Sequence, residues 1–347
     1  SAASDVYKRQ VYASVNDLLD ENKRKNGIQK EEKQEINFVE EQDVFQNLIG
    51  SNGSLKKPIE QMKTSIFYPN TSLPVFLHGP TGSGKSFMAR KIYEFAVQEG
   101  ILKPDAPFII MNCAQYVNNI ELLSSNLFGY VKGAFTGAYA TTKGLLEAAD
   151  GGMLFLDEVH RLNSESQEKL FVFLDQGIFR RMGESEGWHK AKVRMVMATT
   201  ENLESNFLDT FLRRIPIVVQ IPSLRERGEQ ERLQFIYHFF IEESKVLDKK
   251  MKVSGNVIEA LLNHLYQGNI GDLENKIKFI CATAYAKEKR KNEIDIHLEH
   301  LPEDVLKGIA EKAENKIGNY DTVEIYPNAP IPVSYTHLRA HETRSNL

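Results

Sequence analysis

A glycine-rich run with one lysine is the part of the sequence best suited to chemistry. Residues 79–86, GPTGSGKS, match the pattern G-x-x-x-x-G-K-[ST] in full, between an apolar run and a helical pattern. Glycines let backbone N–H groups curve around phosphate oxygens, and the helix N-terminus adds a favourable dipole. We expect Lys85 to reach the outer phosphates of a nucleoside triphosphate and Ser86 to bind Mg²⁺. The predicted phosphate-binding residues are Gly79, Pro80, Thr81, Gly82, Ser83, Gly84, Lys85 and Ser86.

Two adjacent carboxylates supply the second half of this chemistry. Asp157 and Glu158 follow the apolar run GGMLFL, which has the character of a buried strand. A carboxylate at Asp157 can reach the Mg²⁺ held by Ser86. Glu158 can polarise a water molecule toward the γ-phosphate as a general base. Residues 157–160 also spell DEVH, the DExH box of helicases, so a nucleic-acid helicase stays an open alternative.

Polar residues at other strand ends extend the candidate catalytic set. Asn112 could hold the general base in a non-hydrolysing orientation, and it is equally consistent with an ordinary strand-terminal residue. Thr199 and Thr200 end a later apolar run, near the expected γ-phosphate. Arg213 and Arg214 precede the next run. Such a pair is usually solvated surface, but in a ring ATPase it can stabilise transition-state charge on a neighbour's nucleotide.

The elements that must position these residues are short apolar runs alternating with helical patterns. Strands buried on both faces have this composition, as in a parallel sheet covered by helices. The sequence therefore predicts an α/β fold. Ser164 and Gln167 form a capping-box pattern at the start of one of the helices. The predicted strands span residues 73–77, 107–112, 152–157, 193–200 and 216–221.

Composition narrows the class of protein. The 347 residues are 41% hydrophobic and 26% charged, with a net charge of −4, so no global basic field attracts nucleic acid. Cys113 and Cys281 lie in apolar runs without CxxC spacing, and we interpret both as buried thiols in a reducing compartment. Because no apolar run has transmembrane length and no signal peptide is evident, we expect a cytoplasmic protein with no membrane partner.

The chain divides into segments of different character. We expect a charged linker over 11–44, an α/β core over 45–227, a small helical lid without strands over 228–310, and a linker over 311–332. Residues 1–10 and 333–347 resemble translated sequencing-adaptor sequence. We therefore expect the chain to be a fragment of a longer protein.

One motif makes the sequence resemble a known family. Residues 133–138, GAFTGA, lie between the phosphate-binding motif and GGMLFLDE. This order is similar to that of bacterial enhancer-dependent activators, AAA+ ATPases that act on RNA polymerase carrying sigma-54. The resemblance runs from about Asn47 to Leu306. The strings DEVHRL, GIFRRMGE and GNIGDLE look most like the levanase-operon-regulator branch, which carries a helix-turn-helix upstream and phosphotransferase-system (PTS) regulatory domains downstream.

The resemblance implies roles that the residues alone do not. In the family, this loop contacts sigma-54, and the nucleotide state at Glu158 and Asn112 raises or lowers it. Hydrolysis of ATP with Mg²⁺ then converts the closed promoter complex of sigma-54 RNA polymerase to the open one. The segment 176–187 is expected to form a second loop that assists the first. The residues that correspond to the sigma-54 contact are Gly133, Ala134, Phe135, Thr136, Gly137 and Ala138.

The family pattern also implies partners. A ring, by analogy a hexamer, is expected to form by self-association. Promoter-upstream DNA and PTS proteins would be bound by segments outside this sequence.

The sequence departs from the family at three positions. Thr200 stands where an asparagine is usual, Leu208 where the first arginine finger is usual, and Gly271 where the lid carries a sensor arginine. Arginine-finger chemistry can therefore come only from Arg214, with Arg213 as its neighbour. Besides the helicase, a nucleotide-binding scaffold without turnover and a metabolic P-loop kinase are alternatives, and the intact Lys85 argues against the scaffold.

Overall fold

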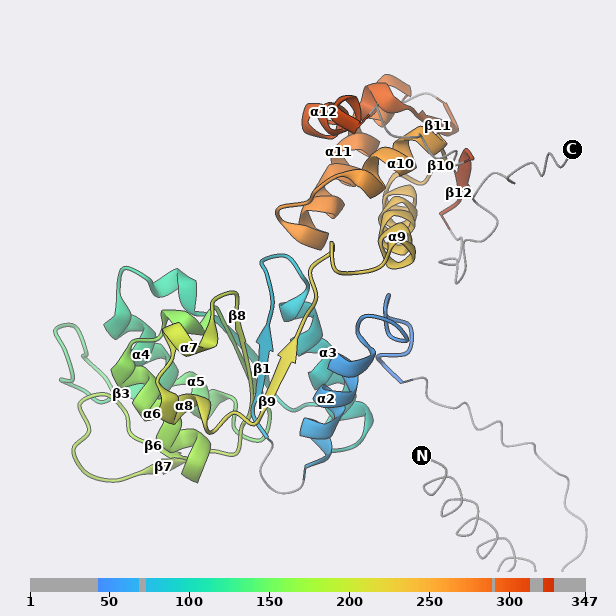
Figure 1. Cartoon of the computed structure of the whole chain (residues 1–347). Coiled ribbons are helices and arrows are strands. Elements are labelled where there is room, and N and C mark those ends of the chain that lie inside the picture. The colour runs from blue at the N-terminus through green and yellow to red at the C-terminus, as the bar shows by residue number, and fades with distance from the viewer. Residues whose placement is uncertain (1–42, 69–72, 289–290, 313–320, 328–347) are drawn as a thin grey trace, which may run out of the picture. The chain divides into compact units, whose positions relative to one another are not determined.

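The computed structural model describes residues 43–68, 73–288, 291–312 and 321–327 of the chain in Figure 1. The segments 1–10 and 333–347 lie outside the described residues. So does the predicted linker 11–44, apart from its last two positions.

A five-stranded sheet forms the core and confirms the predicted α/β class. Its strand order is β2-β5-β8-β1-β9, and every adjacent pair is parallel. Parallel pairing places the carboxyl ends of all the strands at one edge of the sheet. Four of these strands fall within the predicted runs, and β1 overlaps the run 73–77 but extends one residue beyond it, to His78. Their bounds are β1 (Val75–His78), β2 (Phe108–Asn112), β5 (Met153–Asp157), β8 (Arg194–Thr199) and β9 (Ile217–Gln220).

Helices cover both faces of this sheet (Figure 1). Successive residues of a strand point to opposite faces, so Phe76 and Leu154 join one apolar cluster while Leu77 and Phe155 join the other. The first cluster includes α4 (Ile120–Phe128), α5 (Leu145–Ala148) and α6 (Ser164–Gln176). The second includes α2 (Lys56–Phe67) and α3 (Lys85–Gln98). Burial on both faces explains why the three central strands, β5, β8 and β1, have continuous apolar sequences.

The start of α6 differs from the sequence prediction. Its N-cap is Asn163, whose side chain accepts a hydrogen bond from the Ser166 backbone N–H, so Ser164 is the first helical residue and not the cap. Gln167 does not close a capping box either. Its amide donates to the Leu162 carbonyl and its carbonyl accepts from the Leu208 N–H. Asparagine is as good an N-cap as serine, so sequence alone did not decide between the two neighbours.

Short elements connect the sheet. Two antiparallel hairpins, β3 with β4 and β6 with β7, stand apart from the main sheet. The short elements are η1 (Cys113–Tyr116), β3 (Gly129–Tyr130), β4 (Thr142–Lys143), η2 (Val159–Arg161), β6 (Ile178–Phe179), β7 (His189–Lys190), α7 (Leu203–Asn206) and α8 (Asp209–Leu212).

The lid that follows the sheet is not all-helical, which corrects the sequence prediction. A three-stranded sheet of order β11-β10-β12 packs among its helices. The strands are β10 (Lys250–Val253), β11 (Glu293–Ile296) and β12 (Val323–Ile325), and β12 lies in the segment predicted to be a linker. The helical elements are α9 (Glu229–Leu247), α10 (Gly255–Asn263), α11 (Asn269–Glu288), η3 (Leu298–His300) and α12 (Glu303–Lys312).

These strands were not predicted from the sequence because they are short. KMKV and EIDI alternate polar with apolar residues, and their apolar members Met251, Val253, Ile294 and Ile296 are fully buried in the lid. Four residues of alternation are a weak signal beside the long helical patterns around them. The polar members pair across the sheet, for example Lys250 with Glu324 at 2.9 Å.

Two further sequence expectations concern burial and membranes. Cys113 and Cys281 are both buried and free, as predicted. None of the described helices is both long and apolar enough to span a membrane.

Candidate functional site

The glycine-rich run forms the turn between β1 and α3. Gly82 and Gly84 have φ angles of +71° and +100°, which side-chain-bearing residues rarely adopt. A Cβ on Gly82 would also stand 2.0 Å from the Gly268 carbonyl oxygen. Gly84 is the N-cap of α3 and offers no side-chain cap. The first N–H groups of α3 are therefore available to an anion, as the motif predicts.

Lys85 lies buried in this turn. Its ammonium donates hydrogen bonds to the carbonyl oxygens of Gly79 and Pro80, at 2.8 and 3.1 Å. Burial lowers the pKa of Lys85, and the carboxylates of Glu158 and Asp157 oppose that shift. Two carbonyls and two nearby carboxylates thus favour the charged lysine that a phosphate group requires.

Ser86 and Asp157 form the predicted metal-binding pair. The Ser86 hydroxyl donates to Asp157 Oδ2 at 3.1 Å, and the second oxygen of Asp157 accepts from the Glu158 N–H. Within the described residues, no group of three or more acidic, histidine or cysteine side chains could hold a metal. One hydroxyl and one carboxylate fit Mg²⁺, which is usually bound by one or two protein oxygens together with phosphates and water. These two groups are too few to coordinate a metal ion without further ligands.

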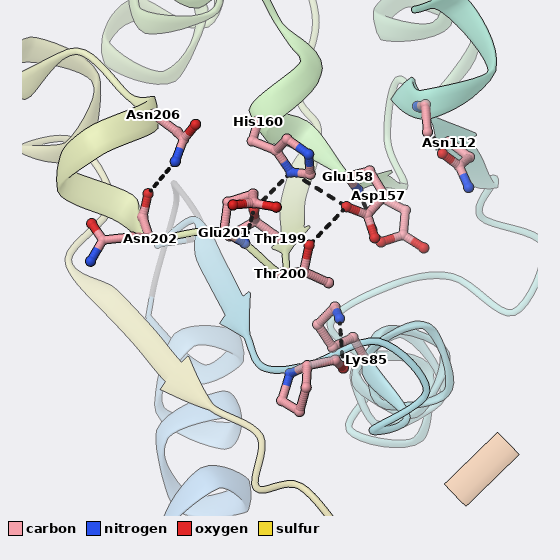
Figure 2. A network of polar contacts seen from close by, with 12 residues as sticks. Lys85, Asn112, Asp157, Glu158, His160, Thr199, Thr200, Glu201, Asn202 and Asn206 are labelled. Atoms are coloured by element: carbon pink, nitrogen blue, oxygen red, sulfur yellow. Dashed lines mark hydrogen bonds and ion pairs between the residues drawn. The ribbon is translucent and has the colours of Figure 1, made fainter. Parts of the chain in front are cut away.

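Glu158 is held in an unusual backbone conformation at the end of β5. Its φ angle is +52°, in the left-handed region, where a residue with a side chain is strained by about 1–2 kcal/mol. Glu158 Oε2 accepts a hydrogen bond from the Thr200 hydroxyl at 3.3 Å and lies 3.3 Å from His160 Nδ1 (Figure 2). The same imidazole nitrogen lies 3.0 Å from the Thr199 hydroxyl oxygen. The predicted base and both threonines therefore meet in one network.

Asn112 lines the same cavity as Glu158 but faces another partner. Its side-chain oxygen accepts from the Ala114 N–H at 2.9 Å and caps η1. Among the described residues, no hydrogen bond joins Asn112 to Glu158. The holding role of Asn112 stays a prediction.

A cavity of about 1070 Å³ opens beside the phosphate-binding turn. The core lines it with the turn itself, Asp157, Glu158 and residues 47–49. The lid lines it with Phe235, Phe239 and Ile270, among others. The helical spacing of the aromatic residues in FIYHFF predicts that they pack the lid, and they do: Tyr237 and Phe240 lie in the lid core, while the partly buried Phe235 and Phe239 pack against it and also line the cavity. The sequence prediction missed that Phe235 and Phe239 would also line the cavity. The signal for this is that aromatic residues occur on two faces of α9.

The lid also binds the phosphate-binding turn directly. The Asn269 side chain donates to the Thr81 carbonyl at 2.7 Å and accepts from the Leu224 N–H at 3.0 Å. The Ile270 N–H donates to the Gly82 carbonyl at 3.1 Å. Gly271, which lacks the sensor arginine of the resemblance, lines the cavity beside them. Backbone and amide contacts thus join lid and core at this point.

Arg213 and Arg214 do not line this cavity. They follow α8, and Arg214 forms an ion pair with Asp175 at 3.0 Å while its guanidinium lies over the Phe171 ring. Within the described chain, the structure therefore does not bring them together with the phosphate-binding residues. Leu208, at the finger position, donates its N–H to Gln167.

Residues 133–138 form a turn between β3 and β4 that is mostly exposed, although Ala138 at its end is buried. The Gly133 N–H donates to the Ala138 carbonyl at 2.9 Å and closes the turn. Gly133 and Gly137 have φ angles of +85° and +101°, so both positions require glycine. Thr136 is exposed, and the partly exposed Phe135 ring lies 5.0 Å from that of Tyr130.

The predicted second loop lies against the first. The Met182 N–H donates to the Gly129 carbonyl, and the Val131 N–H donates to the Met182 carbonyl. A Cβ on Gly183 would stand 2.7 Å from the Ala134 Cβ. Arg181 anchors this segment through two 2.8 Å hydrogen bonds to Glu147, which hold the pKa of that carboxyl below its usual value. The two segments therefore form one packed unit.

Comparison with protein families identifies this arrangement. Residues 48–218 match the model of the sigma-54 interaction domain, and residues 225–317 match that of the AAA+ ATPase lid domain. The chain belongs to the sigma-54 interaction domain family. The resemblance and the AAA+ fold predicted from the sequence are thereby confirmed.

Two transcriptional regulatory proteins are similar to this chain in sequence. The transcriptional regulatory protein LevR of Bacillus subtilis (strain 168) is 46% identical over 259 residues, which cover 74% of this chain and 28% of that protein. DagR of Salmonella typhimurium is 42% identical over 246 residues, covering 70% of this chain and 26% of that protein. The chain therefore spans only about a quarter of the length of these relatives.

Solved structures agree on the fold. NtrX from Brucella abortus superposes with a TM-score of 0.62 at 23% identity, over 74% of this chain and 55% of that one. At this level of identity, the likeness supports the AAA+ fold of the sigma-54 interaction domain alone.

Proposed function

We propose that this chain is an ATP-driven motor that remodels the closed complex of sigma-54 RNA polymerase to the open complex. One observation carries the proposal. A turn at 133–138 with two positive-φ glycines packs on a second loop, in the same domain as a glycine-rich turn in which the Ser86 hydroxyl contacts Asp157. The sigma-54 interaction domain family supports the same partner.

The residues of the cavity have separate roles in this reaction. Lys85 and the backbone N–H groups of residues 81–86 bind the phosphates of ATP, and Ser86 with Asp157 would hold Mg²⁺. The ion would neutralise charge that develops on the phosphates. Glu158 accepts a proton from the attacking water, while Thr199 and Thr200 lie beside it. The NtrX relative was solved in complex with ATP and with ADP, which supports this choice of nucleotide.

Assembly into a ring, by analogy a hexamer, completes the proposed site. Arg214 and Arg213 are surface residues that do not line the cavity of their own chain, and Arg214 is half exposed. On a ring they could reach a neighbour's nucleotide and stabilise negative charge in the transition state.

The wider role follows from the similarity to LevR. We propose control of sugar operons under the phosphotransferase system in the cytoplasm. Promoter-upstream DNA and PTS proteins would be bound by segments beyond this sequence, since it spans 28% of LevR.

Co-elution with purified sigma-54 tests the proposal. The full chain would be mixed with sigma-54, Mg-ADP and a mimic of the phosphoryl transition state, beside a Thr136→Ala variant. We expect a complex with the wild type that is lost without nucleotide and in the variant. A chain that assembles and hydrolyses ATP without binding sigma-54 would contradict the proposal. ATPase activity that nucleic acid stimulates would then point to the helicase alternative.

A further inference from the structure

His160 is a buried residue whose role nothing above assigns. It lies in η2, three residues after Asp157, and its side chain is 6% exposed. Its Nδ1 contacts both Glu158 Oε2, at 3.3 Å, and Thr199 Oγ1, at 3.0 Å (Figure 2). Its Nε2 is buried and has no hydrogen-bond partner among the described residues. One ring nitrogen therefore carries all the polar contacts of this imidazole.

The neighbours of the ring select one tautomer. Burial lowers the pKa of His160, so the neutral ring carries a single N–H at physiological pH. A proton on Nε2 would leave a buried donor unsatisfied and would turn the Nδ1 lone pair toward the Glu158 carboxylate. A proton on Nδ1 donates to that carboxylate and to Thr199, which also accepts from the Glu201 N–H at 3.1 Å. The Nδ1–H form is therefore favoured.

We propose that His160 is a positioning residue for the general base, which it holds through an Nδ1–H donor shared between Glu158 and Thr199. The inference rests on the proposed ATPase function. It assigns to His160 and Thr200 the orientation of Glu158 that the family resemblance gives to Asn112. In this structure the Asn112 oxygen is taken by the Ala114 N–H.

The geometry determines which carboxylate oxygen of Glu158 is held. Within the described residues, the polar contacts to the Glu158 side chain, from Thr200 and His160, both fall on Oε2. Oε1 is left as the oxygen that can accept a proton from water. Glu158 directly follows Asp157, and the Asp157 carboxylate contacts Ser86. The contacts from His160 and Thr200 therefore also fix the position of Glu158 relative to the predicted metal site. Thr199 ends β8 and is itself fully buried, so the donor is anchored to the sheet.

Two substitutions at His160 distinguish the effect of the Nδ1–H donor from the effect of the space that the imidazole ring fills. An asparagine at 160 can place its amide N–H close to where Nδ1 stands, while a leucine fills space without a donor. The experiment measures kcat and KM for Mg-ATP, and the affinity for a fluorescent non-hydrolysable ATP analogue, with the full chain. The proteins are wild type, His160→Asn, His160→Leu and Glu158→Gln.

We expect kcat of His160→Leu to fall about ten-fold, the usual effect of losing a hydrogen bond to a charged group, with KM and analogue affinity within about two-fold. His160→Asn is expected to keep kcat within about three-fold of the wild type. An unchanged kcat in His160→Leu, or an equal loss in both variants together with weaker analogue binding, would overturn the inference alone. A wild-type rate no higher than that of Glu158→Gln would overturn the proposed function and this inference with it.

Discussion

The Glu231 carboxylate, on the first helix of the lid, accepts hydrogen bonds from both the backbone N–H and the hydroxyl of Ser54, at 2.8 and 2.5 Å. Glycines make the approach possible, because a Cβ on Gly50 or Gly53 would stand 2.6 or 2.3 Å from the same carboxylate oxygens. The turn that Glu231 holds begins with residues 47–49, which line the cavity. A lid residue therefore fixes one wall of the proposed nucleotide site.

Removing this carboxylate should loosen the wall. We expect Glu231→Ala to destabilise the fold by about 1–3 kcal/mol, because partly buried donors lose their acceptor, and to raise KM for ATP several-fold. Thermal unfolding and steady-state kinetics measure the two effects. Glu165→Ala removes an exposed carboxylate that, among the described residues, pairs with Lys169 alone, and this variant should change neither quantity. Equal behaviour of the two variants would show that the contact with Ser54 has no role.

Asn269 should be needed for lid and core to act together. Its φ angle is +53°, so Asn269→Gly removes both side-chain hydrogen bonds without adding backbone strain. We expect weaker binding of a fluorescent ATP analogue, by about five- to ten-fold, because the hydrogen bond to Thr81, the one of the two that contacts the glycine-rich turn, is of ordinary strength. Analogue affinity equal to that of the wild type would show that the contact with Thr81 does not shape the site.

Gly183 tests whether the two loops function as one unit. In Gly183→Ala the new methyl would stand 2.7 Å from the Ala134 Cβ, at a φ angle of +76°. We expect sigma-54 binding to fall at least about ten-fold, as for an overpacked contact, while ATP turnover stays within about two-fold. The matched control is Gly187→Ala in the same segment, where φ is +88° but nothing lies within 4 Å. If the control loses binding equally, backbone strain and not loop packing is the cause.

Both cysteines should be inert in the folded chain. Burial raises the pKa of the Cys113 thiol to about 12, and it also raises that of Cys281. Since the thiolate is the reactive species, neither residue should react with a thiol reagent at neutral pH before unfolding. Titration in buffer and in denaturant measures this. Rapid reaction of either thiol in buffer would contradict the burial described here.

The sequence alone was enough to predict contacts between residues that lie at the carboxyl ends of the parallel strands. Ser86 and Asp157 are far apart in the chain, but each adjoins the carboxyl end of a parallel strand, and such ends share one edge of the sheet. Their 3.1 Å contact was therefore predictable from two local motifs. The central strands themselves were predictable because burial on both faces leaves a continuous apolar sequence.

Features that depend on contacts between segments far apart in the chain were not predicted from the sequence. The strand at Lys250–Val253 gains its hydrogen bonds from segments far along the chain, and its four residues carry little local signal. The sequence does not reveal the contact of His160 with Thr199, because this contact depends on how η2 packs against β8. Phe235 and Phe239 likewise face the cavity only because of how α9 is placed.

In the proposed mechanism, nucleotide state controls how tightly the 133–138 turn binds sigma-54. The most direct test of this control is the affinity of labelled sigma-54 for Glu158→Gln, which should trap ATP, measured by fluorescence anisotropy with ATP and then with ADP. We expect the two affinities to differ at least about ten-fold, a coupling free energy of ordinary size. Equal affinities in both states, from a chain that binds both nucleotides, would contradict the account.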